Sequence, residues 1–203
     1  NGTLYTWSKH SEDPGNLGRL VDEAHPLSVP LEVSSQEFYQ SKDSKGPEEV
    51  KFQKSSQATA IFCGSENTLL LTNSGEVLIS GSNRFGQLGI AHGGVESDVS
   101  SEDPFGEDYE YQTFQYISRL SLANNLKVEK VSCGTFHILA IDTQKNAYAW
   151  GSNSHGQLGL NHFIPEVHLP TLIEELEECS EVSAGNSHSL VVSGPENSVY
   201  AFG

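Results

Sequence analysis

Residues 75–89 and 145–159 read GEVLISGSNRFGQLG and KNAYAWGSNSHGQLG. Both contain the pattern Gly-Ser-Asn-x-x-Gly-Gln-Leu-Gly, which ends at Gly89 in the first copy and at Gly159 in the second. Recurrence of a long pattern within one chain is the signature of a repeat architecture, in which each copy forms one structural unit. We therefore divide the rest of the sequence into repeats by comparison with these two copies.

A second pattern precedes each copy and also occurs a third time. It reads FCGSENTLLLT over residues 62–72, SCGTFHILAI over residues 132–141 and SAGNSHSLVV over residues 183–192. Its glycines are Gly64, Gly134 and Gly185, which are 70 and 51 residues apart. The third copy continues into NSVYAFG, which corresponds to the same strand of the repeat as NGTLYTWS at the start of the chain. The chain therefore holds about four repeats.

Each repeat predicts short β-strands joined by tight turns. Residues 76–80 and 146–150 are rich in β-branched and aromatic side chains, and residues 69–71 are a short apolar run. Ser74-Gly75 and residues 195–197 mark hairpin turns. Short strands with periodic glycine and aromatic positions are typical of radial sheets, which protect their edges. The sequence therefore predicts an all-β fold, a β-propeller.

The combined pattern resembles the repeat of the regulator of chromosome condensation family. It has Ala or Cys before Gly, His three residues after that Gly, an aromatic-Gly strand end and the turn Asn-x-x-Gly-Gln-Leu-Gly. Other propeller repeats fit less well, because the chain has no Trp-Asp pair and its one Gly-Gly pair, Gly93-Gly94, lies in an insertion. Asn67 in place of His and Ser8 in place of Gly indicate a divergent member.

The resemblance implies a seven-bladed ring, which needs more repeats than these 203 residues hold. We therefore expect a partial β-propeller over residues 1–203, a fragment of such a ring. Insertions between repeats map to loops on one face of a repeat architecture. The expected repeat segments are about 1–33, 57–92, 119–172 and 173–203, with a polar insertion at about 34–56 and an acidic insertion at about 93–118.

We expect the recurring glycines and histidines to be structural. Glycine permits positive φ in a tight turn and close approach of neighbouring blades. A His that recurs at one repeat position indicates packing or hydrogen bonding, since a catalytic His is normally unique. Cys63 and Cys133, just before repeat glycines, are expected to be small buried side chains. The structural positions are Gly64, Gly81, Gly86, Gly89, Gly134, His137, Gly151, Gly156, Gly159, Gly185 and His188.

The charge balance favours a basic partner. The chain has 27 acidic and 11 basic residues and a formal net charge of −16. Nucleic-acid binding draws on Lys and Arg, so we expect no direct binding to nucleic acid. No apolar run is long enough to cross a membrane, the first residues are not a signal peptide, and three cysteines without a Cys-x-x-Cys pair suit a reducing compartment. We expect an intracellular protein, cytoplasmic or nuclear, without membrane association.

The acidic insertion is the main candidate for partner binding. Residues 94–111 hold seven carboxylates and no Lys or Arg, with aromatic side chains close behind. Charge and aromatic groups together give both steering and anchoring, although a solvated loop has the same composition. The candidate contact residues are Glu102, Asp103, Glu107, Asp108, Tyr109, Glu110 and Tyr111.

The sequence has no pattern that indicates catalysis. Gly81 and Gly86 have the spacing of a phosphate-binding loop, but Gln87 stands where that loop requires Lys, and the pattern recurs. Neither Gly-x-Ser-x-Gly nor His-Glu-x-x-His occurs, and no close pair of cysteines could hold zinc. We therefore predict no catalytic residue, no metal site, no cofactor and no active site.

Two functions are consistent with these observations. The first is a protein–protein interaction scaffold that binds partners through acidic loops, because loops on a rigid scaffold carry recognition. The second is implied by the resemblance, since the founding member of the family exchanges guanine nucleotide on the nuclear-transport GTPase. The partner would be a basic protein surface in the first case and a small Ran-like GTPase in the second. The oligomeric state does not follow from the sequence.

Overall fold

The computed structural model describes residues 5–6, 31–32, 57–89, 110–116 and 127–203. For residues 5–6, 31–32 and 110–116 it describes the backbone alone. The regular structure of the described residues consists of β-strands in four antiparallel sheets. The polar insertion at 34–56 and most of the acidic insertion lie outside the described residues.

The strands follow one another through the sheets in chain order. A small sheet pairs β1 (Tyr5–Thr6) with β2 (Leu31–Glu32). The first blade contains β3 (Ala58–Cys63), β4 (Asn67–Thr72), β5 (Val77–Ser82) and β6 (Glu110–Tyr116). The second blade contains β7 (Val128–Cys133), β8 (His137–Asp142), β9 (Ala147–Ser152) and β10 (Glu166–Leu172). The third blade contains β11 (Glu181–Ala184), β12 (Ser189–Ser193) and β13 (Ser198–Phe202).

The first and second blades have the same internal register. Asn67 pairs with Gly81 in the first blade, and His137 pairs with Gly151 in the second. All six residues of β8 are buried, as expected for an apolar strand with covered faces. The β8–β9 hairpin places Lys145 at φ 71, next to a turn in which the carboxylate of Asp142 accepts backbone N–H bonds.

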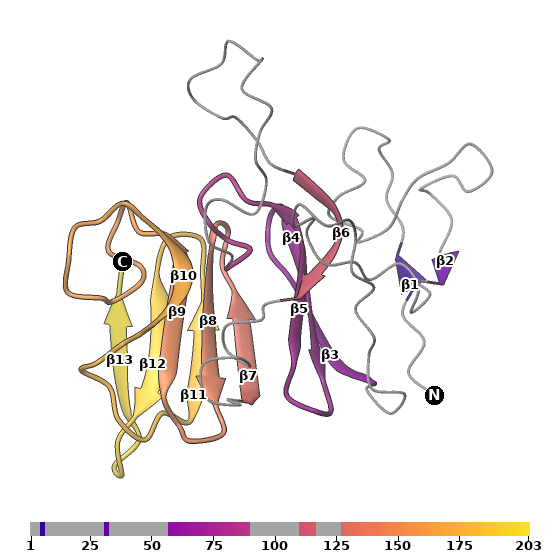
Figure 1. The fold of residues 1–203 in the computed structure, drawn as a ribbon. Coiled ribbons are helices and arrows are strands. Elements are labelled where there is room, and N and C mark those ends of the chain that lie inside the picture. Colours follow the sequence, from indigo (N-terminus) through magenta and orange to yellow (C-terminus); the bar gives the residue numbers. More distant parts are fainter. Residues whose placement is uncertain (1–4, 7–30, 33–56, 90–109, 117–126) are drawn as a thin grey trace.

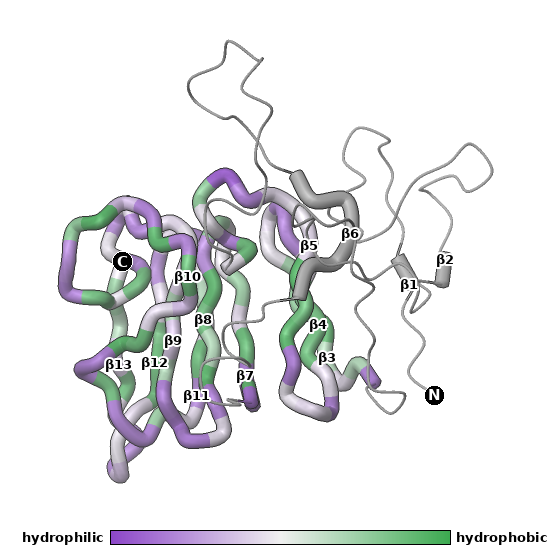
Figure 2. The backbone as a smooth tube through the Cα atoms, viewed as in Figure 1, coloured by the Kyte–Doolittle hydropathy of each residue, from purple (hydrophilic) through white to green (hydrophobic). Residues whose placement is uncertain are grey.

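The three blades stand side by side, and their first strands contact one another in turn (Figure 1). β7 contacts β3 on one side and β11 on the other. Apolar side chains fill the two spaces between blades, and the interior strands are correspondingly hydrophobic (Figure 2). Sheets that pack face to face with their first strands on a common side form a β-propeller. The all-β propeller fragment that the repeats predict is confirmed.

Two details differ from the sequence expectations. The fourth strand of the first blade, β6, lies inside the range that we assigned to the acidic insertion. Cys63 is exposed, which corrects the expectation of a buried side chain, whereas Cys133 is half-buried. The reason is the alternation of β3, in which Ala60 and Phe62 pack toward the second blade while Cys63 lies on the other face.

Candidate protein-interaction surface

The recurring turn Asn-x-x-Gly-Gln-Leu-Gly is closed by its own side chains. In the first blade the side-chain oxygen of Asn83 accepts the N–H of Leu88 at 3.0 Å, and that of Gln87 accepts the N–H of Phe85 at 2.7 Å. Gly86 has φ 79, a left-handed conformation that favours glycine.

The second blade repeats this geometry. The side-chain oxygen of Asn153 accepts the N–H of Leu158 at 3.1 Å, and that of Gln157 accepts the N–H of His155 at 2.9 Å. Gln87 and Gln157 are both buried. The pattern therefore uses its Asn and Gln to shape the backbone, in place of the Lys that would bind a phosphate.

The first interface, between the first and second blades, is aromatic and apolar. Trp150 is completely buried, and its indole Nε1–H donates to the carbonyl of Gln87 at 2.8 Å. The rings of Phe85 and Phe136 lie 4.8 Å apart across the same interface. A Cβ added to Gly64 would lie 2.9 Å from the carbonyl oxygen of Gly134, so the first strands approach closely there.

The second interface, between the second and third blades, has a polar centre. Nε2 of His137 lies 2.9 Å from Oγ of Ser189, and that hydroxyl donates to the carbonyl of Gln157 at 2.6 Å. Because the single hydroxyl proton goes to the carbonyl, the imidazole is assigned the proton on Nε2. Burial, with a smaller contribution from the nearby charge of His188, lowers the pKa of His137 to about 4, so the ring is neutral near pH 7.

Further contacts join the second and third blades around this polar centre. The ring of Phe202 packs on Gly159, where an added Cβ would lie 2.9 Å from the ring. Thr135 donates to the side chain of Asn186 at 2.8 Å, and the half-buried Lys130 donates to the carbonyl of Ser180 at 2.8 Å. Most of the repeated residues thus contact one another within or across blades. His188 is exposed, in contrast to the buried His137, and Gly156 is exposed as well.

The predicted partner-binding residues lie at the edge of the described part or beyond it. Glu102, Asp103, Glu107, Asp108 and Tyr109 fall outside the described residues. Glu110 and Tyr111 begin β6, where their backbones pair with Ser82 and Gly81. The end of the acidic stretch is therefore attached to the outer strand of the first blade.

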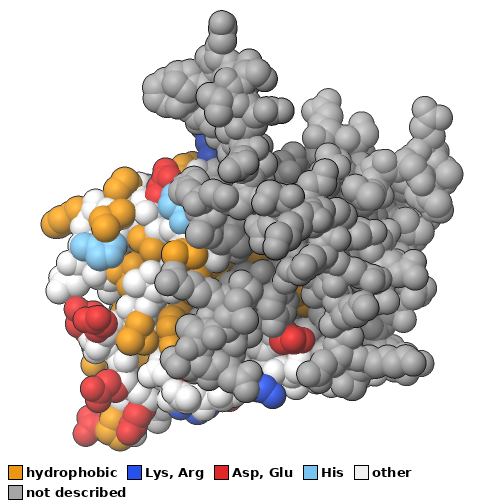
Figure 3. Space-filling view, viewed as in Figure 1, with side chains coloured by type: hydrophobic (Ala, Val, Ile, Leu, Met, Phe, Trp, Pro, Cys, Tyr) orange, Lys and Arg blue, Asp and Glu red, His pale blue; other side chains and the backbone are white. Residues whose placement is uncertain are grey.

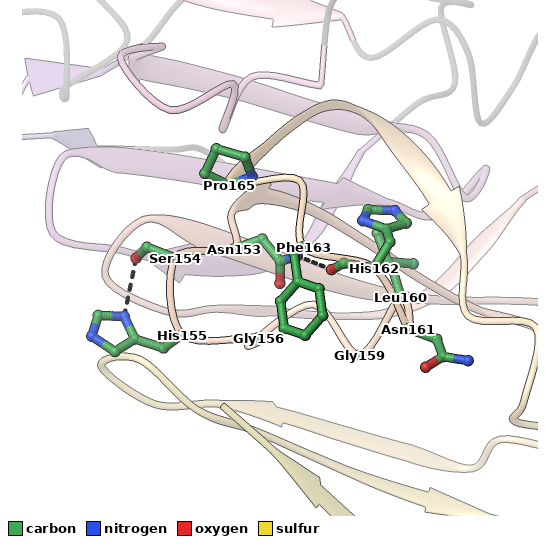
Figure 4. Close-up of a pocket in the computed structure, with 10 residues that line it drawn as sticks. All are labelled: Asn153, Ser154, His155, Gly156, Gly159, Leu160, Asn161, His162, Phe163 and Pro165. Atoms are coloured by element: carbon green, nitrogen blue, oxygen red, sulfur yellow. Dashed lines mark hydrogen bonds between the residues drawn. The ribbon is translucent and has the colours of Figure 1, made fainter.

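A pocket that sequence reasoning missed lies in the second blade, between β9 and β10. It measures about 500 Å³ and is lined by Asn153, Ser154, His155, Gly156, Gly159, Leu160, Asn161, His162, Phe163 and Pro165 (Figure 4). The ring of Phe163 is fully exposed. The one signal in the sequence was that the segment after Gly159 has no counterpart in the other repeats.

The described residues contain little that could support catalysis. They hold no group of three His, Cys, Asp or Glu side chains arranged to bind a metal ion. Burial raises the pKa of the Cys133 and Cys179 thiols, so neither is an activated nucleophile. A search of the same residues for long apolar helices that could cross a membrane finds none.

Models of the Regulator of chromosome condensation (RCC1) repeat match residues 58–87, 128–157 and 146–192. Among curated relatives, the probable E3 ubiquitin-protein ligase HERC6 of Homo sapiens is 30% identical over 149 residues. That match covers 72% of this chain but only 13% of the human protein. The chain thus corresponds to a small part of this relative.

Solved structures show the same fold. Yeast RCC1 (Prp20), crystallised with Kap60, superposes with a TM-score of 0.67 at 20% identity, over 98% of this chain and 39% of that one. A structure of Prp20p from Saccharomyces cerevisiae, described with its binding properties to Gsp1p and histones, gives 0.63 at 19% identity, over 98% and 41%. Identity at this level establishes the β-propeller architecture and leaves partners to be inferred separately.

Proposed function

The chain belongs to the regulator of chromosome condensation repeat family, and on that premise we propose that it is a protein–protein interaction scaffold that binds partners through acidic loops. The observation that carries this proposal is that the repeated residues are engaged in contacts between blades. The carbonyls of Gln87 and Gln157 accept hydrogen bonds from the next blade, and Trp150 and His137 are buried between blades. Recognition therefore falls to the segments that do not recur.

The acidic stretch before β6 is the segment best suited to this role. It holds carboxylates without a single Lys or Arg, in a chain with a net charge of −16. Such a field attracts a basic protein surface and accelerates its association. The pairing of Glu110 with Ser82 attaches the stretch to a rigid sheet, so that loop and scaffold act together.

The proposal includes the absence of an active site in this chain. Its support is the protonated state of Cys133 and Cys179 and the use of His137 as a buried, neutral hydrogen-bonding group. The ligase named among the relatives is far longer than the part that this chain matches. We also propose an intracellular location, cytoplasmic or nuclear, because all three cysteines are free thiols.

Charge neutralisation tests the scaffold function without removing a strand. Deleting residues 94–111 would cut into β6, so the better variant is E102Q/D103N/E107Q/D108N in the intact protein. We expect at least about a tenfold loss of its protein partners in quantitative pulldowns, strongest at low salt. The matched variant E174Q/E175Q/E177Q/E178Q neutralises four exposed carboxylates of the other acidic loop, on the connector between β10 and β11, and shows how much each loop contributes. Equal partner recovery from both variants and the unchanged protein would refute the proposal.

A second function, guanine nucleotide exchange on a small Ran-like GTPase, is supported by the fold shared with Prp20p and by the described binding of that protein to Gsp1p. An acidic loop could lower the affinity of a GTPase for its nucleotide by binding the nucleotide-free state more tightly. Release of fluorescent GDP from a panel of small GTPases tests this function. Acceleration that the E102Q/D103N/E107Q/D108N variant loses would support it, and unchanged release from every GTPase would exclude it.

A further inference from the structure

We draw no further inference here: the strongest candidate, the cluster of exposed glutamates that the connector between β10 and β11 and the adjoining β12–β13 hairpin form at the lower end of the second and third blades (Figure 3), belongs to the acidic loops of the proposed function, and nothing among the described residues shows what would cover it.

Discussion

The two interfaces between described blades use one repeat position with different chemistry. In both, the backbone carbonyl of the recurring Gln accepts a hydrogen bond from the next blade. At the first interface the donor to Gln87 is the indole of Trp150, inside an apolar cluster. At the second the donor to Gln157 is the hydroxyl of Ser189, which is also paired with His137. The turn thus supplies a fixed acceptor, and each following blade supplies its own donor.

The comparison explains why one repeat carries Asn67 where the next carries His137. Nδ2 of Asn67 donates within its own blade, to the carbonyls of Ser82 at 2.7 Å and Ser80 at 3.3 Å. At the first interface the residue equivalent to Ser189 is the apolar Ile138, which offers a ring nitrogen no partner. The histidine is therefore tied to the second interface, and its protonation should affect that interface alone.

The largest expected effect is at the first interface. Replacing Trp150 by Ala should destabilise the protein by about 3–5 kcal/mol, because it leaves a cavity and removes the bond to Gln87. Urea unfolding followed by circular dichroism measures the loss. W150F, which keeps an aromatic ring, should lose less. A loss of under about 1 kcal/mol in W150A would show that this interface does not hold the blades together.

The second-largest effect is a pH dependence of stability that arises at the second interface alone. The pKa of His137 is about 4 in the folded chain and near 6.5 when exposed, so the unfolded state binds the proton more readily. The contribution of His137 to the free energy of unfolding should therefore be fully present above pH 6.5 and fall by about 3 kcal/mol as the pH drops to 4.

His137→Asn tests this assignment. This variant should lower the free energy of unfolding at pH 7.5 and remove this part of its pH dependence. Asn67→His should gain no such stabilisation, because the first interface has no hydroxyl like that of Ser189 to pair with the ring. Chemical unfolding at pH 7.5, 6 and 4.5 provides the comparison. An unaltered pH profile in the His137→Asn variant would contradict the assignment.

A smaller effect is expected from the close approach of the first strands. In Gly134→Ala the new methyl would collide with the ring of His137 and lie 2.6 Å from the carbonyl oxygen of Gly185. We expect a loss of about 2 kcal/mol. In Gly64→Ala the nearest atom is 2.9 Å away, so the loss should be smaller when the thermal unfolding of both variants is measured. The reverse order would contradict the described spacing of the blades.

The smallest effect concerns the exposed ion pair between Lys130 and Glu181 across the second interface. Replacing Glu181 by Gln should change stability by less than about 1 kcal/mol, and the change should vanish in high salt. Thermal unfolding in low and high salt measures it. A loss comparable to that of W150A would mean that charge, rather than packing, joins the second and third blades.

The sequence predicts the inner strands well and the outer ones poorly. Residues 76–80 were expected as a strand and β5 extends over Val77–Ser82, because an inner strand covered on both faces selects a run of apolar, β-branched residues. The fourth strands β6 and β10 were not recognised as strands. Their sequences, EYQTFQY and EVHLPTL, do not resemble each other, since an outer strand has one free edge and looser packing requirements.

The candidate surface was harder to predict than the fold. The sequence pattern separates repeated from unrepeated segments, which directs attention to the acidic stretch but not to the loop after Gly159. It does not reveal that Asn153, a repeated residue, also fixes the loop that displays Phe163. The residue type alone does not show whether a Phe is exposed or buried, and only the fold distinguishes the two. The contacts of Glu102, Asp103, Glu107 and Asp108 remain a prediction.

Hydrogen–deuterium exchange of the intact protein, free and bound to a partner recovered in the pulldowns, tests the division between repeated scaffold and unrepeated recognition most directly. The account predicts slow exchange in β4 and β8 in both states, with added protection on binding centred on residues 90–109. Protection confined to the turns at Gly86–Gly89 and Gly156–Gly159, with none in residues 90–109, would contradict it.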